Sequence, residues 1–402
     1  MTWKNKIICY LSAQTISQFG SSLVQYALIW KITLDTSSGL ALAISTFCGF
    51  LPQFLISPFA GVLADRKNRK MLLIASDALI ALATLWLLVM ELWQGADIGM
   101  IYVVLAIRSL GSGIQGPASQ TAIVDIVPDN ALQKVHGFNA SLNSVSMLLA
   151  PALSAWLLAS FSFQFVLSID LVTALIGISM MFTIALPQNN TGQTVTYFKD
   201  IQEGWQYLKT QPWLAKLLLY QAMLMLLISP TAFMTPLCVS RVFGNELWYL
   251  SVAEITYSLG MVIGGIVIAH LSGFQDKFKT TFLAGAFYGL CMVGLGSFKT
   301  LLLFYLANTL IGISSPCYNA PLYTGLQERV DKVLLGRIFS VLGMVNSLAM
   351  PLGMQMFGPL ADLIPVGYVF VGCGIVVLLL SSYMFFVNPC TTKHYKLFPR
   401  KY

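Results

Sequence analysis

Long apolar stretches set the strongest limit on how this chain can fold. The sequence has 402 residues, of which 57% are hydrophobic and only 10% are charged, whereas soluble domains are about a quarter charged. A helix needs roughly 20 apolar residues to cross the hydrocarbon of a membrane. Polar, proline and glycine breaks delimit twelve such stretches: 7–31, 40–64, 71–93, 98–119, 138–160, 163–186, 213–238, 248–271, 280–298, 300–322, 336–359 and 364–388. We therefore predict an all-α integral membrane protein with twelve transmembrane helices.

The basic residues are distributed unevenly between the two sides of the predicted membrane. If the N-terminus is cytoplasmic and the helices alternate, the cytoplasmic segments hold eighteen lysines and arginines, and the outer side keeps only Lys31, Arg241 and Lys299. Such an excess normally marks cytoplasmic loops, so both termini are predicted to be cytoplasmic. Topology therefore explains the net charge of +7, and we expect no nucleic-acid partner. The basic tail at 391–402 is expected to meet anionic lipid headgroups.

The polar segment 187–212 divides the predicted helices six and six. It begins as a flexible linker and continues as a predicted amphipathic helix around Trp205. Motifs recur at nearly one offset on either side of it, pairing Leu110-Gly111 with Ile311-Gly312 and Pro151 with Pro351. We predict two pseudo-symmetric six-helix halves and a basic tail, at 1–186, 213–390 and 391–402. Duplicated halves around a binding site at mid-membrane are usual in secondary transporters.

Cysteine and histidine show no pattern that suggests a metal or a disulfide framework. The seven cysteines are scattered without a C-x-x-C pair, and the three histidines lie far apart. The sequence also lacks G-x-S-x-G, H-E-x-x-H and a glycine-rich phosphate loop. We expect no cofactor, no metal site and no enzymatic activity.

Several predicted helices carry polar side chains along one face. Small polar residues often serve helix packing, but glutamine and asparagine are bulkier than packing requires, so we expect them to line a water-accessible cavity. Methionine and phenylalanine in 213–238 suit apolar ligands of varied shape, with ordinary packing as the alternative. The predicted cavity residues are Gln14, Gln18, Gln25, Ser112, Gln115, Met223, Phe233, Asn308, Ser315 and Asn319.

Charged residues inside the predicted spans are the sharper signal. Arg108 lies near mid-depth in 98–119, where insertion of an arginine costs about 2.5–3.5 kcal/mol or more, so it must face a cavity or a carboxylate. Arginine stays protonated, but it changes the proton affinity of a neighbouring carboxylate. Glu254 is our first candidate proton carrier, because it shares a polar stripe with serines. Asp170 and Asp77 follow, with a structural ion pair as the alternative.

A short basic turn joins the second and third apolar stretches. Residues Gly61–Lys70 read G-V-L-A-D-R-K-N-R-K. The four cations fix the membrane side of this turn, whereas Asp65 contributes little to topology.

These residues resemble the signatures of the major facilitator superfamily of transporters. Gly61–Lys70 is similar to the loop between its second and third helices, with Asn68 where glycine is usual, and Arg108 with Gly111 resembles a proton-coupling signature. An antiporter signature is matched in spacing, with Ser or Ala replacing most glycines, by Gly137, Ser146, Ala150, Pro151, Ser154 and Ala155. Within the superfamily the chain most resembles the macrolide-efflux group, through Gly49–Pro52, Ile107–Ser109, Gly336–Ser340 and Ser347–Pro351.

The resemblance implies export of amphiphilic drugs, typically macrolide antibiotics, in exchange for protons across a bacterial plasma membrane. The alternatives are export of an endogenous amphiphile, such as a siderophore, lysolipid or peptide, import, and a non-transporting sensor or scaffold. The implied partners are the small amphiphile, protons and membrane lipid, with a separate ABC-type resistance protein as the candidate protein partner. We expect the chain to work as a monomer.

The resemblance also gives the basic turn a mechanical role as a cytoplasmic gate. It implies that Asp65 faces the helix start near Gly336, where exposed N–H groups favour an anion. It implies a second pair between Arg69 and Asp125. The alternative is that the basic residues of the turn only determine topology.

Overall fold

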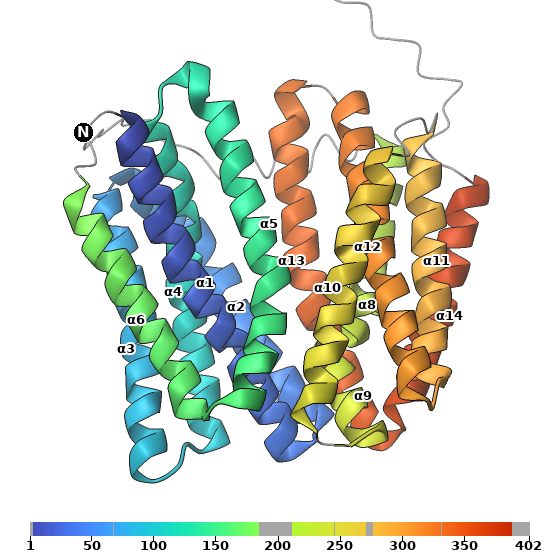
Figure 1. Cartoon of the computed structure of the whole chain (residues 1–402). Helices are drawn as coiled ribbons and strands as arrows, with labels where there is room; N and C mark the ends of the chain where they lie inside the picture. The colour runs from blue at the N-terminus through green and yellow to red at the C-terminus, as the bar shows by residue number, and fades with distance from the viewer. Residues whose placement is uncertain are drawn as a thin grey trace, which may run out of the picture. The chain divides into compact units, whose positions relative to one another are not determined.

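The computed structural model describes residues 3–66, 68–184, 211–244, 246–270, 276–330 and 332–387. Within these ranges the chain is helical and has no strand (Figure 1). The helices are α1 (Trp3–Thr36), α2 (Gly39–Arg66), α3 (Arg69–Trp93), α4 (Ile98–Ile126), α5 (Asp129–Ser160), α6 (Phe163–Thr183), α8 (Pro212–Phe233), α9 (Thr235–Val242), α10 (Leu247–His270), α11 (Lys277–Ser297), α12 (Leu301–Arg329), α13 (Lys332–Leu363) and α14 (Val366–Val387).

All of these helices except α9 are long. Ten contain a segment long and apolar enough to cross a membrane, which confirms the prediction of an all-α membrane protein. Among the described residues, α1 and α13 do not meet this criterion. In α1 the cause is visible in the sequence, because Gln14, Gln18 and Gln25 lower the mean hydropathy of a segment that is otherwise apolar.

Local capping explains several helix starts. The Asn68 side chain accepts hydrogen bonds from the backbone N–H groups of Lys70 and Met71, and so caps α3. Asp97, Ser162 and Asp276 cap the next membrane helices in the same way. A polar side chain at this position satisfies N–H groups that the helix leaves unpaired. Asn68, which stands where the resembled loop signature usually has glycine, is the N-cap residue just before α3.

The predicted span 213–238 is wrong in its second part. The helix α8 ends at Phe233, Met234 leaves the helical conformation with φ −102° and ψ 1°, and the short α9 begins at Thr235. Pro236 lies in the first turn of α9. Proline has no N–H to bond to the carbonyl four residues earlier, and its ring clashes with that carbonyl, so a continuous helix through this point is interrupted.

Backbone contacts divide the chain into two compact units. The first unit is Met1–Val195 with Phe233–Ile255 and Gln355–Leu363, and the second is Thr196–Ala232, Thr256–Met354 and Ile364–Tyr402. The division into halves at 1–186 and 213–390 follows chain order and stays a prediction. The predicted linker up to residue 210 and the predicted tail lie outside the described residues.

In the first unit, α1 packs against α5 and α6, α4 against α2 and α3, and α3 against α6. Two buried apolar clusters hold these helices together, one around Tyr10, Leu73 and Ile123 and one around Leu28, Leu105 and Leu167. Close packing needs glycine at Gly113, where a Cβ atom would lie 2.3 Å from a side-chain carbon of Ile56 on α2.

In the second unit, α11 packs against α12 and α14, around a buried cluster that includes Phe278 and Phe282. In chain order α11, α12 and α14 correspond to α3, α4 and α6. The contacts of α11 with α12 and α14 therefore repeat the contacts of α3 with α4 and α6. The predicted glycine pair is not equivalent, however. Gly111 packs against α3 whereas Gly312 packs against α10, and it is Gly113 that faces α2, the counterpart of α10. The repeat therefore holds for the helices but is offset by two residues at this pair.

Candidate functional site

A pocket of about 400 Å³ lies in the first unit, lined by α1, α2, α4 and the end of α8. Five predicted cavity residues line it, namely Gln18, Gln25, Ser112, Gln115 and Phe233. Phe50 lines it too, and its ring meets that of Phe233 edge-on with the ring centres 5.8 Å apart. The wall therefore combines amide and hydroxyl groups with a pair of aromatic rings.

Arg108 also lines this pocket, although its side chain is only 3% exposed. One terminal nitrogen, Nη1, forms an ion pair with Asp170 and donates to Thr84, and Nη2 donates to the Ser21 carbonyl at 2.8 Å. The second carboxylate oxygen of Asp170 accepts from the Ser21 hydroxyl at 2.8 Å. A buried ion pair is tolerated when further hydrogen bonds satisfy its remaining atoms. Ser21 of α1 and Thr84 of α3 supply such bonds, whereas Nε of Arg108 is buried without a hydrogen-bond partner among the described residues.

A second carboxylate, Asp77 on α3, lies behind the same wall and is 2% exposed. Its Oδ1 accepts hydrogen bonds from Ser17 Oγ at 2.8 Å and from Gln115 Nε2 at 2.7 Å. Its Oδ2 is buried without a hydrogen-bond partner in the described part of the chain. Because Gln115 lines the pocket, its amide connects the pocket wall directly to this carboxylate.

Gln14 is placed differently from the other glutamines of α1. Its side chain is 4% exposed, and both amide atoms are buried without a partner among the described residues. Gln14 precedes Ser17 by about one helical turn, so both lie on one face of α1. It belongs to the buried polar region around Asp77 and is not part of the pocket lining.

The remaining predicted residues do not gather at this pocket. Glu254 on α10 is half-buried and makes no ion pair with any described residue. Met223 lines a separate apolar groove of about 460 Å³ between α8 and α14 in the second unit. Asn308 donates to Thr256 Oγ1 at 3.4 Å, and Asn319 donates to the Ser315 carbonyl at 3.0 Å. The predicted cavity residues Asn308, Ser315 and Asn319 therefore make their contacts within the second unit.

The second unit has its own buried polar chain, which the sequence patterns missed. Gln221 on α8 accepts from the Tyr318 hydroxyl and donates to Asn346 Oδ1 at 2.9 Å. Tyr220, the neighbouring residue, lies 2.9 Å from Ser381 Oγ through its hydroxyl. The feature of the sequence that could have indicated this polar chain is the adjacent pair Tyr220 and Gln221 within an apolar stretch.

Two residues of the predicted cytoplasmic gate meet in the first unit. Arg69 at the start of α3 forms an ion pair with Asp125 at the end of α4, and their side chains are 12% and 6% exposed. The side chain of Asp65 and the surroundings of Gly336 lie outside the described residues, so the structure does not address that contact.

The residues that match the antiporter signature contribute mainly to packing of α5. Ser154 donates to the Leu23 carbonyl of α1 at 2.8 Å, and Ala150, Pro151 and Ala155 are buried. Ser146 is half-buried, whereas Gly137 is exposed and a Cβ atom there would meet nothing within 4 Å.

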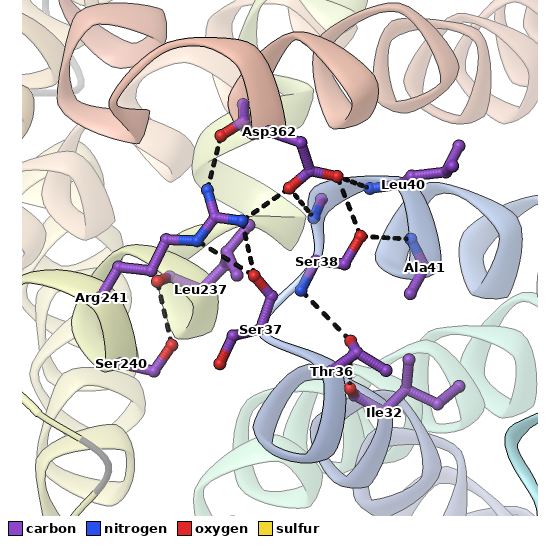
Figure 2. Close-up of polar contacts among 12 residues, drawn as sticks. Ile32, Thr36, Ser37, Ser38, Leu40, Ala41, Leu237, Ser240, Arg241 and Asp362 are labelled. Atoms are coloured by element: carbon purple, nitrogen blue, oxygen red, sulfur yellow. Dashed lines mark hydrogen bonds and ion pairs between the residues drawn. The ribbon is translucent and has the colours of Figure 1, made fainter.

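A network around Asp362 joins three segments that are far apart in the sequence (Figure 2). Asp362, near the end of α13, accepts from Gly39 N at 2.7 Å, Leu40 N at 2.9 Å and Ser38 Oγ at 2.9 Å, and thereby caps the N-terminus of α2. It also forms a 2.6 Å ion pair with Arg241 of α9. No local motif pointed to this network, because each segment contributes a different part of it.

The backbone at this network is tightly constrained. Arg241 also donates to the carbonyl groups of Ser37 and Ala361, at 3.0 Å from Nε to Ser37 (Figure 2). Ser37 has φ 47°, a conformation that residues other than glycine rarely adopt. Nearby, α2 and α13 touch so closely that a Cβ atom on Gly39 would lie 2.2 Å from the Gly358 carbonyl oxygen.

Asp362 stays ionised over the whole physiological range. Burial alone would oppose its ionisation, but the N–H groups of Gly39 and Leu40, the Arg241 guanidinium and the Ser38 hydroxyl together outweigh burial. They lower the pKa of Asp362 from 3.8 to about 2. Its charge therefore favours the capped N-terminus of α2 at any pH above about 4.

Comparison with known proteins identifies the family. Macrolide efflux protein A of Streptococcus pyogenes is 29% identical over 386 residues, which are 94% of this chain and 95% of that protein. The staphyloferrin A transporter of Staphylococcus aureus is 20% identical, with 94% and 95% of the two chains covered. The crystal structure of a bacterial homologue of the human lysosomal transporter Spinster, inward-facing and unoccupied, matches the fold with a TM-score of 0.70 at 14% identity over 99% of both chains. Residues 10–354 match the Major Facilitator Superfamily, and the chain belongs to that family of multi-pass membrane transporters.

Proposed function

We propose that this transporter exports amphiphilic molecules, with macrolide antibiotics as the first candidates, across the bacterial plasma membrane in exchange for protons. The observation that carries the proposal is the pocket in which amide side chains, two aromatic rings and a buried ion pair share one wall. A volume of about 400 Å³ lies within the range of small-molecule sites. The relation to macrolide efflux protein A supports the substrate class.

The pocket wall suits molecules with separate polar and apolar faces. Phe50 and Phe233 offer an apolar surface, and Gln18, Gln25 and Gln115 offer donors and acceptors in fixed positions. Glutamine amides bind hydroxyl, ether and carbonyl oxygens without requiring a particular charge. We therefore expect substrates to be selected by shape and amphiphilic character.

Proton coupling is proposed to involve the carboxylates near this pocket. Arg108 holds Asp170 in a buried ion pair, so movement of the guanidinium would change the proton affinity of that carboxylate. Asp77 and Glu254 are the other candidates. Alternating exposure of the pocket to the two sides then exchanges substrate and proton.

Two sets of contacts are proposed to close the pathway in turn. The charge bias of the loops supports a cytoplasmic position for Arg69 and Asp125, and an outer position for the Asp362 network. Asp65, directed toward Gly336, completes the cytoplasmic gate in this proposal. Export by Asp65→Asn tests it, because a full transport rate with unchanged membrane insertion would contradict a gating role for Asp65.

The function is tested by substrate-induced proton movement in inverted membrane vesicles, with a macrolide, a dye and a siderophore as substrates. Proton efflux from acidified vesicles on addition of a macrolide is the expected result. The matched control is Gln120→Ala, because Gln120 is an exposed glutamine of α4 that does not line the pocket, whereas Gln25→Ala and Phe50→Ala should each weaken the response.

The second candidate is export of a siderophore, which the relation to the staphyloferrin A transporter favours. An efflux-deficient host that gains no macrolide resistance from this chain but releases more siderophore would establish that alternative. We further propose that the chain works as a monomer in contact with lipid, with an ABC-type resistance protein as its candidate partner. A response from purified monomer in vesicles would show that no partner is required.

A further inference from the structure

We infer that Asp77 is the residue that binds the exchanged proton, and that Gln115 couples it to the substrate pocket. This inference rests on the proposed proton exchange and assigns it to one side chain. Asp77 belongs to the buried polar region behind the pocket wall, and its two oxygens have different surroundings.

Asp77 is buried with one carboxylate oxygen that no described residue contacts by a hydrogen bond, and a proton on that oxygen would remove the buried charge. Oδ1 accepts two hydrogen bonds, from Ser17 and Gln115, whereas the buried Oδ2 accepts none within the described ranges. An ionised carboxylate with an unpartnered buried oxygen carries a large desolvation cost. Protonation of Oδ2 removes that charge and leaves both hydrogen bonds to Oδ1 in place.

Asp170 provides the contrast. Both of its oxygens accept hydrogen bonds, and Arg108 forms an ion pair with it. The buried guanidinium of Arg108 balances the charge of Asp170, whereas no described cation forms an ion pair with Asp77. Glu254 is half-buried and has no described hydrogen bond to the pocket wall, whereas Asp77 has one through Gln115.

The surroundings of Asp77 contain few other charges. Among the described side chains, α1 contributes Tyr10, α6 contributes Asp170 and α4 contributes Arg108. Tyr10 donates to Ser119 and is therefore a neutral phenol engaged elsewhere. With Asp77 ionised, the group of Arg108, Asp170 and Asp77 carries one net negative charge. With Asp77 protonated, it carries none.

This balance predicts how substrate and proton exclude one another. A cationic group that enters the pocket lowers the proton affinity of Asp77 by Coulomb repulsion of the proton. The proton then leaves Oδ2, the carboxylate regains its negative charge, and the substrate cation balances it. Gln14, whose amide is buried without a partner among the described residues, lies on the same face of α1 as Ser17 and keeps that face polar.

The test uses the purified full-length chain and does not depend on transport. Infrared difference spectra between low and high pH should contain the carbonyl stretch of a buried protonated carboxyl group. We expect Asp77→Asn to remove this band, and the matched variants Asp170→Asn and Glu254→Gln to retain it. Persistence of the band in Asp77→Asn, or its loss in Glu254→Gln, would overturn the assignment whether or not the chain exports macrolides.

Ser17→Ala is a second variant that keeps the carboxyl group. It removes a hydrogen bond that is stronger to the ionised form than to the protonated form, so the midpoint of the band should move to higher pH. An unchanged midpoint would contradict protonation at Asp77 even if Asp77→Asn failed to fold. Added sodium should leave the band unchanged, and loss of the band in sodium at constant pH would show that the site binds Na⁺ and not a proton.

Substrate coupling is measured in the same spectra. A macrolide with a protonated amine should reduce the band, and a neutral amphiphile of similar size should not. If Asp77→Asn loses the band, but no amphiphile changes the band of the parent chain, the assignment of the proton to Asp77 is supported and the proposed substrate class is contradicted. An equal response to charged and neutral amphiphiles would overturn the charge argument.

Discussion

Two of the arginine–aspartate pairs among the described residues have sharply different surroundings. Arg108 and Asp170 are 3% and 0% exposed and lie among helices of the first unit, whereas Arg241 and Asp362 are both 29% exposed and lie at helix ends. A buried pair cannot lose one partner cheaply, because the remaining charge has no water around it. An exposed pair can separate at a small cost. Separating an arginine–aspartate pair is therefore costly at the buried site and cheap at the exposed site.

The largest effect should come from removing one partner of the buried pair. Arg108→Ala leaves the buried Asp170 without its counter-ion, and we expect a loss of about 3–5 kcal/mol in the free energy of unfolding. Thermal unfolding in detergent measures it. The double variant Arg108→Gln with Asp170→Asn removes both charges and should recover most of that loss without restoring transport. Full stability of Arg108→Ala would show that the pair is not desolvated.

A packing change near the exposed pair should have the next largest effect. A Cβ atom on Gly358 would lie 2.6 Å from the Ala43 side chain and from the Gly39 carbonyl oxygen. Gly358→Ala therefore forces α2 and α13 apart and should cost about 1–3 kcal/mol of unfolding free energy. The control is Gly372→Ala, where a Cβ atom would meet nothing within 4 Å. Equal unfolding midpoints for the two variants would contradict the close contact.

Breaking the exposed pair itself should cost less. Asp362→Asn and Arg241→Gln are each expected to reduce stability by roughly 1 kcal/mol or less. Export should change more than stability in Asp362→Asn, because the charged contact of the proposed outer gate is lost while the amide oxygen can still accept from the N-terminus of α2. A double-variant cycle on unfolding midpoints measures the coupling. A coupling as large as that of the buried pair would refute the distinction between the two sites.

The smallest expected effect is that of pH on the exposed pair. The pKa of Asp362 is lowered to about 2 from 3.8, so its stabilising contribution is complete above pH 4 and is lost only as pH falls through about 2. The stability difference between the parent chain and Asp362→Asn should therefore be constant from pH 8 to pH 5. A difference that shrinks within that window would mean that the carboxylate titrates there.

The sequence predicted the helices better than it predicted the sites. Apolar runs locate the membrane helices because the bilayer imposes their length, and the cost of a buried arginine requires a partner for Arg108. Which of three carboxylates it meets depends on how α4 and α6 rotate against each other, and no local pattern encodes that rotation. The Asp362 network combines residues near positions 38, 241 and 362, so it appears only in three dimensions. The break at Met234 was readable from Pro236 and was missed because the run remains apolar through Cys238.

The polar face of α1 has a consequence for how the protein is made. This helix is synthesised before α3 and α6, yet its serines at positions 17 and 21 find their hydrogen-bond partners in Asp77 of α3 and in Asp170 of α6. Until those helices are synthesised, its glutamines and serines face either lipid or water, and neither hydrocarbon nor a single apolar neighbour satisfies them. Stable insertion of α1 must therefore wait until the chain has been synthesised as far as Asp170 in α6, so the insertion of this helix depends on helices that follow it.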